Sequence, residues 1–218
     1  MSLSDEEILE NKNKFLSFVN EINREGMNKE LLIRQLTESD FFYAPASANY
    51  HGNYPGGLCE HSLKVYENLC KLISMFYPDK WSEPEAENTI AIVALFHDFS
   101  KMCFYTNEVK NKKVYSENGS KQDSMGKYDW VSVQGYGYRD VKDRFLIGNH
   151  EENSAFMINS FIPLTAEEWC AISHHHAGTS NDSTKQNPFD YWTKFPLSLF
   201  LHQADCLATF IIEEEEWK

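Results

Sequence analysis

The segment IAIVALFHDFSKM, from Ile90 to Met102, is the most apolar run of the chain, and an adjacent histidine and aspartate stand near its end. Burying an ionised carboxylate without a partner is costly, so the surroundings of Asp98 are strongly constrained if this run lies in the core. The dipeptide alone is weak evidence for a functional site, because short motifs often arise by chance. The partners of His97 and Asp98 must therefore be sought in the rest of the chain.

The composition is that of a globular protein. The chain has 218 residues, 42% of them hydrophobic and 14% aromatic, which predicts a single domain over 1–218 with a sizeable core. No stretch approaches the ~20 apolar residues of a membrane span, and the acidic N-terminal segment lacks an apolar signal. The five cysteines are scattered and never spaced as C-x-x-C, which indicates reduced thiols and favours a cytoplasmic location.

The charge balance bears on the kind of ligand. The chain has 20 basic and 33 acidic residues, a net charge of −13. This charge opposes binding to long duplex nucleic acid, whose affinity rests largely on neutralising phosphates with lysine and arginine. It does not oppose a small phosphorylated ligand held at a local site.

Hydrophobic periodicity predicts helices along most of the chain. Ser4 and Glu7 form a capping-box pattern, Asn28 is a candidate cap, and helices are expected within 4–36. Further helices are expected over about 58–76, through the run at 90–102, from about 149 to Pro163, from Thr165 to about 176, and from Pro196 onward. Loops are expected at 44–57 and 177–188, and the glutamates at 213–216 indicate a solvated helix end.

Residues 103–145 break this helical pattern. β-Branched and aromatic residues occur there with Asn-Gly punctuation, as in FYTNEVKNKKVYSENGS and YDWVSVQGYGY, which is typical of β-hairpins. The sequence therefore predicts an all-α fold, a helical bundle, with a small β-hairpin insertion at 103–145.

Two of the predicted helices place histidines on particular faces. His61 lies on the apolar stripe of its helix, so it is expected to point into the domain. His97, Asp98 and Lys101 follow Ala94 at spacings of three, four and seven residues, which places all four on one helix face.

Five further histidines and Asp205 stand at predicted helix ends or in the last helix. His150 is expected in the first turn of its helix, and the triple at 174–176 ends the helix that begins at Thr165. His202 and Asp205 are three residues apart in the last helix.

Two interpretations of this set are open. Each histidine alone could be an ordinary core residue bonded to a carbonyl. Asp98 and Asp205 both follow apolar helical turns, however, and one bound cation would satisfy both carboxylates and the neutral imidazoles together. A mixed set of imidazoles and carboxylates suits Mn, Fe, Co, Ni or Zn better than Mg or Ca.

The order H…HD…H…HH…D resembles the HD-domain superfamily of metal-dependent phosphohydrolases. The resemblance covers about residues 40–212 and rests on GGLCEHSLKV at 56–65, LFHDFSK at 95–101, GNHEENS at 148–154, ISHHH at 172–176 and LFLHQADCLATF at 199–210. The segments around 45–65 and 199–210 are most similar to phage-type and Gram-positive HD hydrolases and to the HD domain of certain 3′→5′ exoribonucleases. The G-Y-P signature of cyclic-di-GMP hydrolases does not occur.

The resemblance implies an all-α fold with one or two divalent transition metal ions at its centre. Carried over by position, His61, His97, Asp98 and Asp205 would hold a first ion, and His150, His174 and His175 a second, with Asp98 bridging. His176 makes a triple where the family carries a pair, so the registers 174–175 and 175–176 both remain open.

The resemblance further implies hydrolysis of a phosphoester by a metal-activated water. Lys101 is expected to contact a phosphate oxygen or to pair with Asp98. His51 is expected to contact a phosphate or leaving group, or to be an ordinary loop histidine. Trp130 is expected to stack on a base, with the hairpin lying over the metal centre, or to pack the hairpin onto the domain.

The expected partner is a small nucleotide or short oligonucleotide, and the sequence leaves the oligomeric state open. Two alternatives remain. The first is a catalytically weak HD-type module that binds nucleotides or regulates another activity. The second is a purely structural helical protein, which leaves the set of histidines unexplained.

Overall fold

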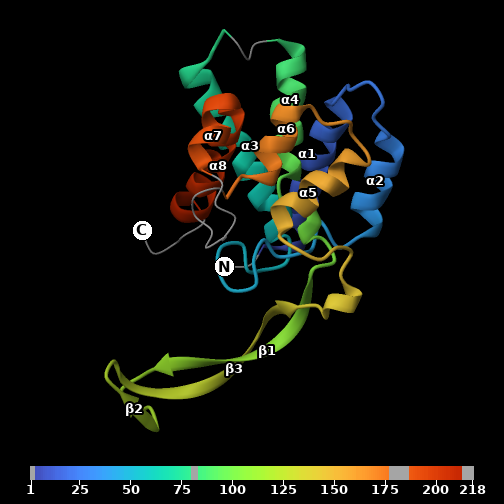
Figure 1. Cartoon of the computed structure of the whole chain (residues 1–218). Helices are drawn as coiled ribbons and strands as arrows, with labels where there is room; N and C mark the ends of the chain where they lie inside the picture. Colours follow the sequence, from blue (N-terminus) through green and yellow to red (C-terminus); the bar gives the residue numbers. More distant parts are fainter. Residues whose placement is uncertain (1–2, 80–82, 177–186, 213–218) are drawn as a thin grey trace.

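Helices make up the body of the protein, and a narrow β-arm extends from it in the computed structural model (Figure 1). The structure describes residues 3–79, 83–176 and 187–212. The helices are α1 (Asp5–Glu21), α2 (Lys29–Glu38), α3 (Gly57–Phe76), α4 (Pro84–Phe96), α5 (His150–Asn159), α6 (Ala166–Ser173), α7 (Pro188–Lys194) and α8 (Pro196–Leu207). Short 3-10 turns lie at Phe99–Lys101 and Val141–Asp143, and a π-helical turn lies at Ala208–Ile212.

The helix starts follow local signals in the sequence. α1 and α6 begin with capping boxes, in which Ser4 and Thr165 accept from the backbone N–H groups of Glu7 and Glu168, whose carboxylates accept in return. Asparagine side chains cap α2 and α5, and Pro196 opens α8. The predicted starts of these helices are confirmed.

The core lies where α3, α4, α6 and α8 pack together. All residues of α4 from Ile90 to Phe96 are buried, as their unbroken apolar run predicts. The rings of Phe15 and Phe99 meet Phe96 edge to face, at centroid distances of 5.7 Å and 5.5 Å. This packing fixes the C-terminal end of α4, where His97 follows.

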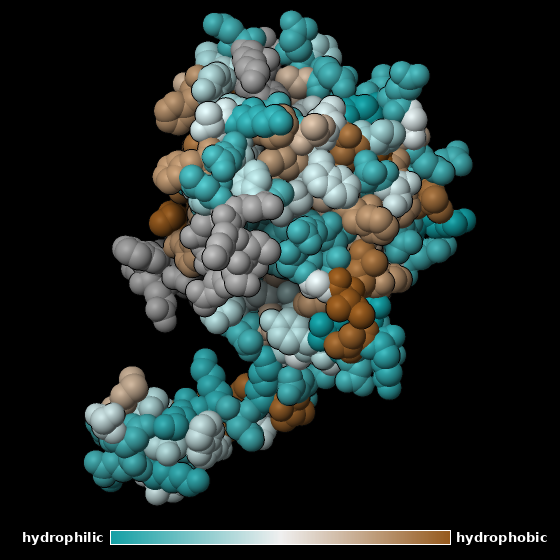
Figure 2. Space-filling model, viewed as in Figure 1, coloured by the Kyte–Doolittle hydropathy of each residue, from teal (hydrophilic) through white to brown (hydrophobic). Residues whose placement is uncertain are grey.

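The insertion predicted at 103–145 forms a three-stranded antiparallel sheet. Its strands are β1 (Tyr105–Tyr115), β2 (Lys121–Asp123) and β3 (Gly126–Tyr138), in the order β1-β3-β2. β1 and β3 pair along their full length, from Tyr105 opposite Tyr138 at the base to Tyr115 opposite Tyr128 near the tip. The arm leaves the helical body (Figure 1), and Figure 2 shows it mostly in teal and white. A mostly helical fold with a small antiparallel insertion is thus confirmed.

Other features differ from the expectations or fall outside the described residues. α4 ends at Phe96, so His97 and Asp98 lie in a turn and not on the face of a continuing helix. The sequence did not predict α7. A loop was predicted at 177–188, but residues 177–186 lie outside the described residues. The glutamates at 213–216 also lie outside them. None of the described helices has the length and apolar character needed to cross a membrane.

Candidate metal centre

Five separate segments bring histidines and aspartates to one place in the interior. α3 supplies His61, the turn after α4 supplies His97 and Asp98, α5 begins with His150, the turn after α6 carries His175 and His176, and α8 supplies Asp205. These seven residues are called the His/Asp cluster below. His97 and His175 are fully buried. His150 and His176 are partly exposed, so the cluster is open to solvent on their side.

Local contacts fix the elements around the His/Asp cluster. Gly57 opens α3 against the backbone of Gly52, and a Cβ at position 57 would collide with the Gly52 carbonyl oxygen. The turn after α4 is joined to α5 through two serines. The Ser100 N–H donates to Ser154 Oγ at 3.0 Å, and Ser100 Oγ donates to the His150 carbonyl at 2.9 Å. The position of His150 relative to the turn is therefore fixed by hydrogen bonds.

Asp98 lies at the centre of the His/Asp cluster, and its two oxygens face different histidines. Oδ2 lies 3.4 Å from His97 Nε2 and 3.9 Å from His61 Nε2. Oδ1 lies 3.4 Å from His150 Nε2 and 3.7 Å from His175 Nε2. The carboxylate therefore stands between two sets of imidazoles.

Asp205 makes a second link between histidines of the two sets. Its Oδ1 lies 3.1 Å from His61 Nε2, and its Oδ2 lies 3.1 Å from His176 Nε2. His202, nearly one turn earlier on α8, donates from Nδ1 to the His175 carbonyl at 2.7 Å. α8 is therefore tied to the turn after α6, and the two halves of the cluster are held together.

Three overlapping groups of ligand atoms, all among described residues, are close enough to hold an ion. They are His61, His97 and Asp205; His97, Asp98 and His175; and His150, His175 and His176. Within each group the ligand atoms lie within 4.8 Å of one another. The buried histidines and aspartates could therefore hold a metal ion.

Backbone carbonyls decide which nitrogen of two central histidines faces the cluster. His97 Nδ1 lies 2.8 Å from the Ala94 oxygen, and His175 Nδ1 lies 2.7 Å from the Ile172 oxygen. A carbonyl oxygen only accepts, so Nδ1 carries the proton and Nε2 presents a lone pair toward Asp98. This is the form of imidazole that binds a metal.

Three buried atoms of the cluster have no hydrogen-bond partner in the part of the chain that the structure describes: Asp98 Oδ1, His150 Nε2 and His175 Nε2. The two nitrogens lie 3.4 Å and 3.7 Å from the carboxylate oxygen. Buried polar atoms are nearly always partnered, and an unsatisfied one costs roughly 1–3 kcal/mol. Lone pairs directed at one another repel unless a cation lies among them. The residues present therefore fit a metal ion at this point.

Burial and hydrogen bonding give these histidines different protonation states. Burial lowers the pKa of His150 to about 4 and that of His175 well below its usual value. Burial opposes the charged form of His176 as well, but hydrogen bonds to Asp205 and Glu151 raise its pKa to about 9. At neutral pH His150 and His175 are therefore neutral, and His176 holds a proton that metal binding would displace.

Lys101 is buried beside Asp98, with its Nζ 2.6 Å from Oδ2. Burial alone would raise the pKa of Asp98, but the charge of Lys101 holds it well below its usual range. The charge of Asp98 in turn raises the pKa of Lys101 despite burial. Of the two roles expected for Lys101, the structure shows the pairing with Asp98.

His174 lies outside the cluster, in contrast to the expected pair at 174–175. α6 ends at Ser173, and His174 Nδ1 lies 2.8 Å from Ser173 Oγ. The His174 ring contacts Tyr191, with ring centroids 4.0 Å apart. His176 lies in the cluster at the place expected for His174. The reason is that the backbone leaves the helical path after Ser173, so the three histidines no longer follow helical spacing. The geometry therefore favours the register 175–176.

Glu151 was missed by the sequence analysis. Its Oε1 lies 3.0 Å from His176 Nδ1, and its Oε2 lies 3.5 Å from His150 Nδ1. One carboxylate therefore orients two imidazoles from the side away from the cluster, as carboxylates commonly do for metal-binding histidines. The only signal in the sequence was its position next to His150.

Tyr105, the first residue of β1, was also missed. Its side chain is buried, and its hydroxyl donates to the Ala46 carbonyl at 3.3 Å. Burial raises the pKa of Tyr105 to about 12, and the charges of Lys101 and Asp98 act on it as well. Tyr105 therefore lies where the base of the arm meets the His/Asp cluster.

The other two candidate substrate-binding residues lie in different places. The His51 ring lies 4.7 Å from the His61 ring, so the loop at 44–57 brings it beside the cluster. Trp130 of β3 lies opposite Lys113 of β1 in the sheet. It is eight residues along β3 from Tyr138, which is at the base of the arm, and eight residues of strand span about 26 Å. The expectation that the hairpin lies over the metal centre is wrong, because β1 and β3 pair with each other and leave the helical body (Figure 1).

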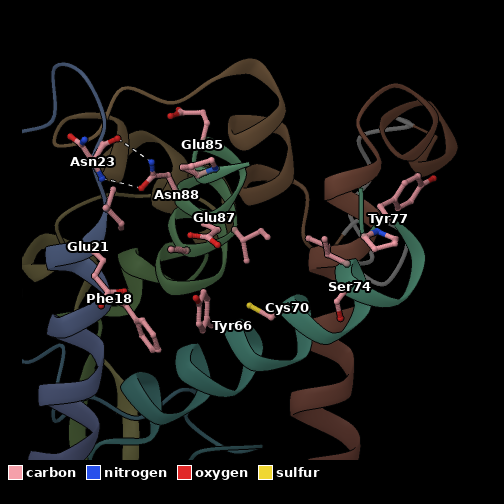
Figure 3. Close-up of a pocket in the computed structure, with 16 residues that line it drawn as sticks. Phe18, Glu21, Asn23, Tyr66, Cys70, Ser74, Tyr77, Glu85, Glu87 and Asn88 are labelled. Atoms are coloured by element: carbon pink, nitrogen blue, oxygen red, sulfur yellow. Dashed lines mark hydrogen bonds between the residues drawn. The ribbon is translucent and has the colours of Figure 1, made fainter. Parts of the chain in front are cut away.

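A separate cavity of about 710 Å³ lies between α1, α3 and α4 (Figure 3). Phe18, Tyr66 and Cys70 contribute to its lining. Figure 3 also shows the hydrogen bonds between Asn23 and Asn88 beside it, at 2.9 Å and 3.1 Å. Its described lining shares no residue with the His/Asp cluster, so this cavity is not part of the candidate metal centre.

No protein-family model, curated protein or solved structure matches the chain significantly. The class of the protein is therefore defined by its own fold and site. It is a mostly helical protein with a small antiparallel β-arm and a buried cluster of histidines and aspartates that could hold a metal ion.

Proposed function

We propose that this chain is a metal-dependent phosphohydrolase of the HD type that acts on a nucleotide or short oligonucleotide. The observation that carries the proposal is the convergence of Asp98 Oδ1, His150 Nε2 and His175 Nε2, three buried atoms for which the described residues offer no hydrogen bond. The order H…HD…H…HH…D adds support, because the five segments that carry it meet at one place.

A divalent metal bound here would lower the pKa of a water molecule and neutralise phosphoryl oxygens. Asp98 is ionised at neutral pH, so either of its oxygens can act as a ligand. Backbone carbonyls hold the Nε2 lone pairs of His97 and His175 in place. The partly exposed side of the cluster, at His150 and His176, is where a phosphoester would enter.

The donor set also indicates which metals fit. Imidazoles with carboxylates favour Mn, Fe, Co, Ni or Zn over Mg or Ca, which prefer oxygen ligands alone. The placement of Asp98 between two sets of imidazoles supports two ions rather than one. The five free cysteines suit a reducing cytoplasm, where such an enzyme would act.

The proposal is tested by metal-dependent hydrolysis. The purified chain is stripped with EDTA, reloaded with Mn²⁺, and incubated with bis-p-nitrophenyl phosphate, nucleotides and short oligonucleotides. We expect hydrolysis to appear only with the metal. Metal binding without turnover of any substrate would favour the alternative, an HD-type module that binds nucleotides or regulates. Absence of metal binding would contradict both.

The number of ions is tested by His150→Ala. His150 faces Oδ1 of Asp98 only, so its removal should lower the metal content from about two ions per chain to about one. His174→Ala is the matched control, because this histidine lies outside the cluster and its removal should leave the metal content unchanged. Both variants are measured by elemental analysis. Full metal content in His150→Ala would show that this histidine is not a ligand.

A further inference from the structure

The register of the arm gathers its aromatic residues on one face. Residues directly opposite each other in an antiparallel pair point to the same side of the sheet, and so do alternate residues along a strand. By this rule the six aromatic residues of β1 and β3 share a face: Tyr105, Tyr115, Tyr128, Trp130, Tyr136 and Tyr138. This side of the sheet is called the aromatic face below. The sequence alone could not show it, because it depends on which residues pair across the arm.

The other side chains of the aromatic face are mostly polar and carry little negative charge. Glu108 and Asp129 belong to the opposite face, but Asp123 of β2 lies on this one, where its Oδ2 pairs with Lys113 Nζ at 2.7 Å and accepts from the Tyr115 hydroxyl at 2.9 Å. Lys113 lies over the rings of Tyr128 and Trp130, at 4.3 Å and 5.6 Å from their centroids. Rings, amides and a lysine together form a surface suited to planar bases linked by phosphates.

The arm departs from the acidic balance of the whole chain. Residues 105–138 contain five lysines and four acidic residues, against 20 basic and 33 acidic residues overall. A polyanion that the helical body repels is therefore tolerated along the arm. Three of the four exposed valines of β1 and β3, Val114, Val131 and Val133, lie on the opposite face. Val109 is the one valine on the aromatic face, which therefore lacks the continuous aliphatic core that a tightly packed second copy would need.

The aromatic face begins at the candidate metal centre. Tyr105 lies at its inner end, where its buried hydroxyl donates at 3.3 Å to the carbonyl of Ala46, in the same loop that brings His51 to 4.7 Å from the His61 ring. Tyr138 follows, with its ring centroid 5.8 Å from that of Tyr105. Trp130 lies farther out and is 49% exposed. The rings thus extend from the cluster toward the tip of the arm.

We propose that the aromatic face binds single-stranded nucleic acid, with successive bases stacking outward from the candidate metal centre. The inference rests on the proposed function in one respect only, the hydrolysis of the phosphodiester at the His/Asp cluster. A mononucleotide at the cluster cannot reach Trp130, which lies about 26 Å along the strand from the base of the arm. Contact with Trp130 therefore requires an oligonucleotide, and the substrate class becomes the single-stranded oligonucleotide.

The binding experiment uses the full-length chain in EDTA, where hydrolysis cannot occur. Fluorescence anisotropy is followed with a labelled oligothymidylate of about 12 nucleotides, within the usual range of single-strand site sizes. Trp130→Ala should raise the Kd about 5-fold or more, because one stacked base contributes at least about that much. Trp130→Phe should retain affinity, because it retains a ring. A labelled dinucleotide should not distinguish these variants from the unmodified chain.

Val131→Ala is the matched control. Val131 is next to Trp130, is similarly exposed, and points to the opposite face. Equal affinity of the unmodified chain, Trp130→Ala and Val131→Ala would overturn the proposal. A second outcome would also overturn it: no oligonucleotide binding, together with a dimer of the unmodified chain that sedimentation shows to be lost in Trp130→Ala. That result would assign the aromatic face to a second copy of the chain. Tyr128→Ala repeats the test at a second ring in case Trp130→Ala does not fold.

The two proposals can fail separately. Hydrolysis of bis-p-nitrophenyl phosphate by the metal-loaded chain reports on the metal centre alone, because this substrate has no base. Hydrolysis without oligonucleotide binding would support the phosphohydrolase and reject the role of the arm. Oligonucleotide binding that Trp130→Ala weakens, without any hydrolysis, would support the arm and reject the phosphohydrolase.

Discussion

Asp98→Asn is expected to abolish metal binding and to lower phosphoester hydrolysis by about 100-fold or more, beyond the range typical of residues that only orient ligands. The substitution keeps the size of the side chain but removes its charge. Asp98 faces four imidazoles through its two oxygens, so no other residue in the cluster can replace it at the centre. Elemental analysis after dialysis against Mn²⁺ measures the loss directly.

The same variant has a second readout in thermal stability. A metal that binds only the folded chain raises its stability with concentration, so Mn²⁺ should raise the Tm of the unmodified chain and leave that of Asp98→Asn unchanged. Asp143→Asn, in an exposed turn, is the control for removing one negative charge. Full metal content in Asp98→Asn, with a Tm that still rises with Mn²⁺, would exclude Asp98 as a ligand.

The parts of the fold that could be predicted are those set by neighbouring residues. The capping boxes at Ser4 and Thr165 and the proline at 196 act within one helical turn, so each predicted start is found. The end of α4 could not be predicted in this way. The spacing of Ala94 and Lys101 is helical, but the chain turns after Phe96 and packs Phe99 into the core. Tertiary packing decided that end.

The residues of the candidate site divide in the same way, into those placed by local sequence signals and those placed by tertiary packing. Helical stripes predicted that His61 points inward, and the structure places it in the cluster. The choice between His174 and His176 depends on the backbone after Ser173, which no periodicity describes. The role of Glu151 depends on contacts across α5 and α6, and the direction of the arm depends on the pairing of its strands. Each of these is a property of the assembled chain.

Glu168→Ala is expected to lower the free energy of unfolding by roughly 3–5 kcal/mol, the usual cost of breaking a buried ion pair. Glu168 is fully buried, and its carboxylate accepts from Arg24 at 2.7 Å and from Thr89 at 2.7 Å. It also accepts from the backbone of Thr165 in the capping box of α6. The substitution would leave Arg24 without its buried partner and would remove the carboxylate half of the capping box of α6. Urea denaturation measures the change.

Glu85→Ala is the matched control, because Glu85 pairs with the same arginine at 3.0 Å but is largely exposed. Exposed pairs contribute about 0–1 kcal/mol, so this variant should lose much less stability.

The pH dependence of the stability is an independent test of the same pair. Burial raises the pKa of Glu168, but bonds from Arg24, Thr165 and Thr89 outweigh it and lower the pKa below its ordinary 4.5.

A carboxyl group with a lowered pKa in the folded state contributes stability that is fully present above its unfolded pKa and is lost as the pH falls through its folded pKa. The unmodified chain should therefore lose stability below about pH 4.5 partly through Glu168, and Glu168→Ala should lose less over the same range. Equal acid sensitivity of the two chains would show that the buried pair does not hold α6.

α6 leads directly into the turn that carries His175 and His176. Glu168→Ala should therefore also weaken metal binding, although Glu168 touches no ligand.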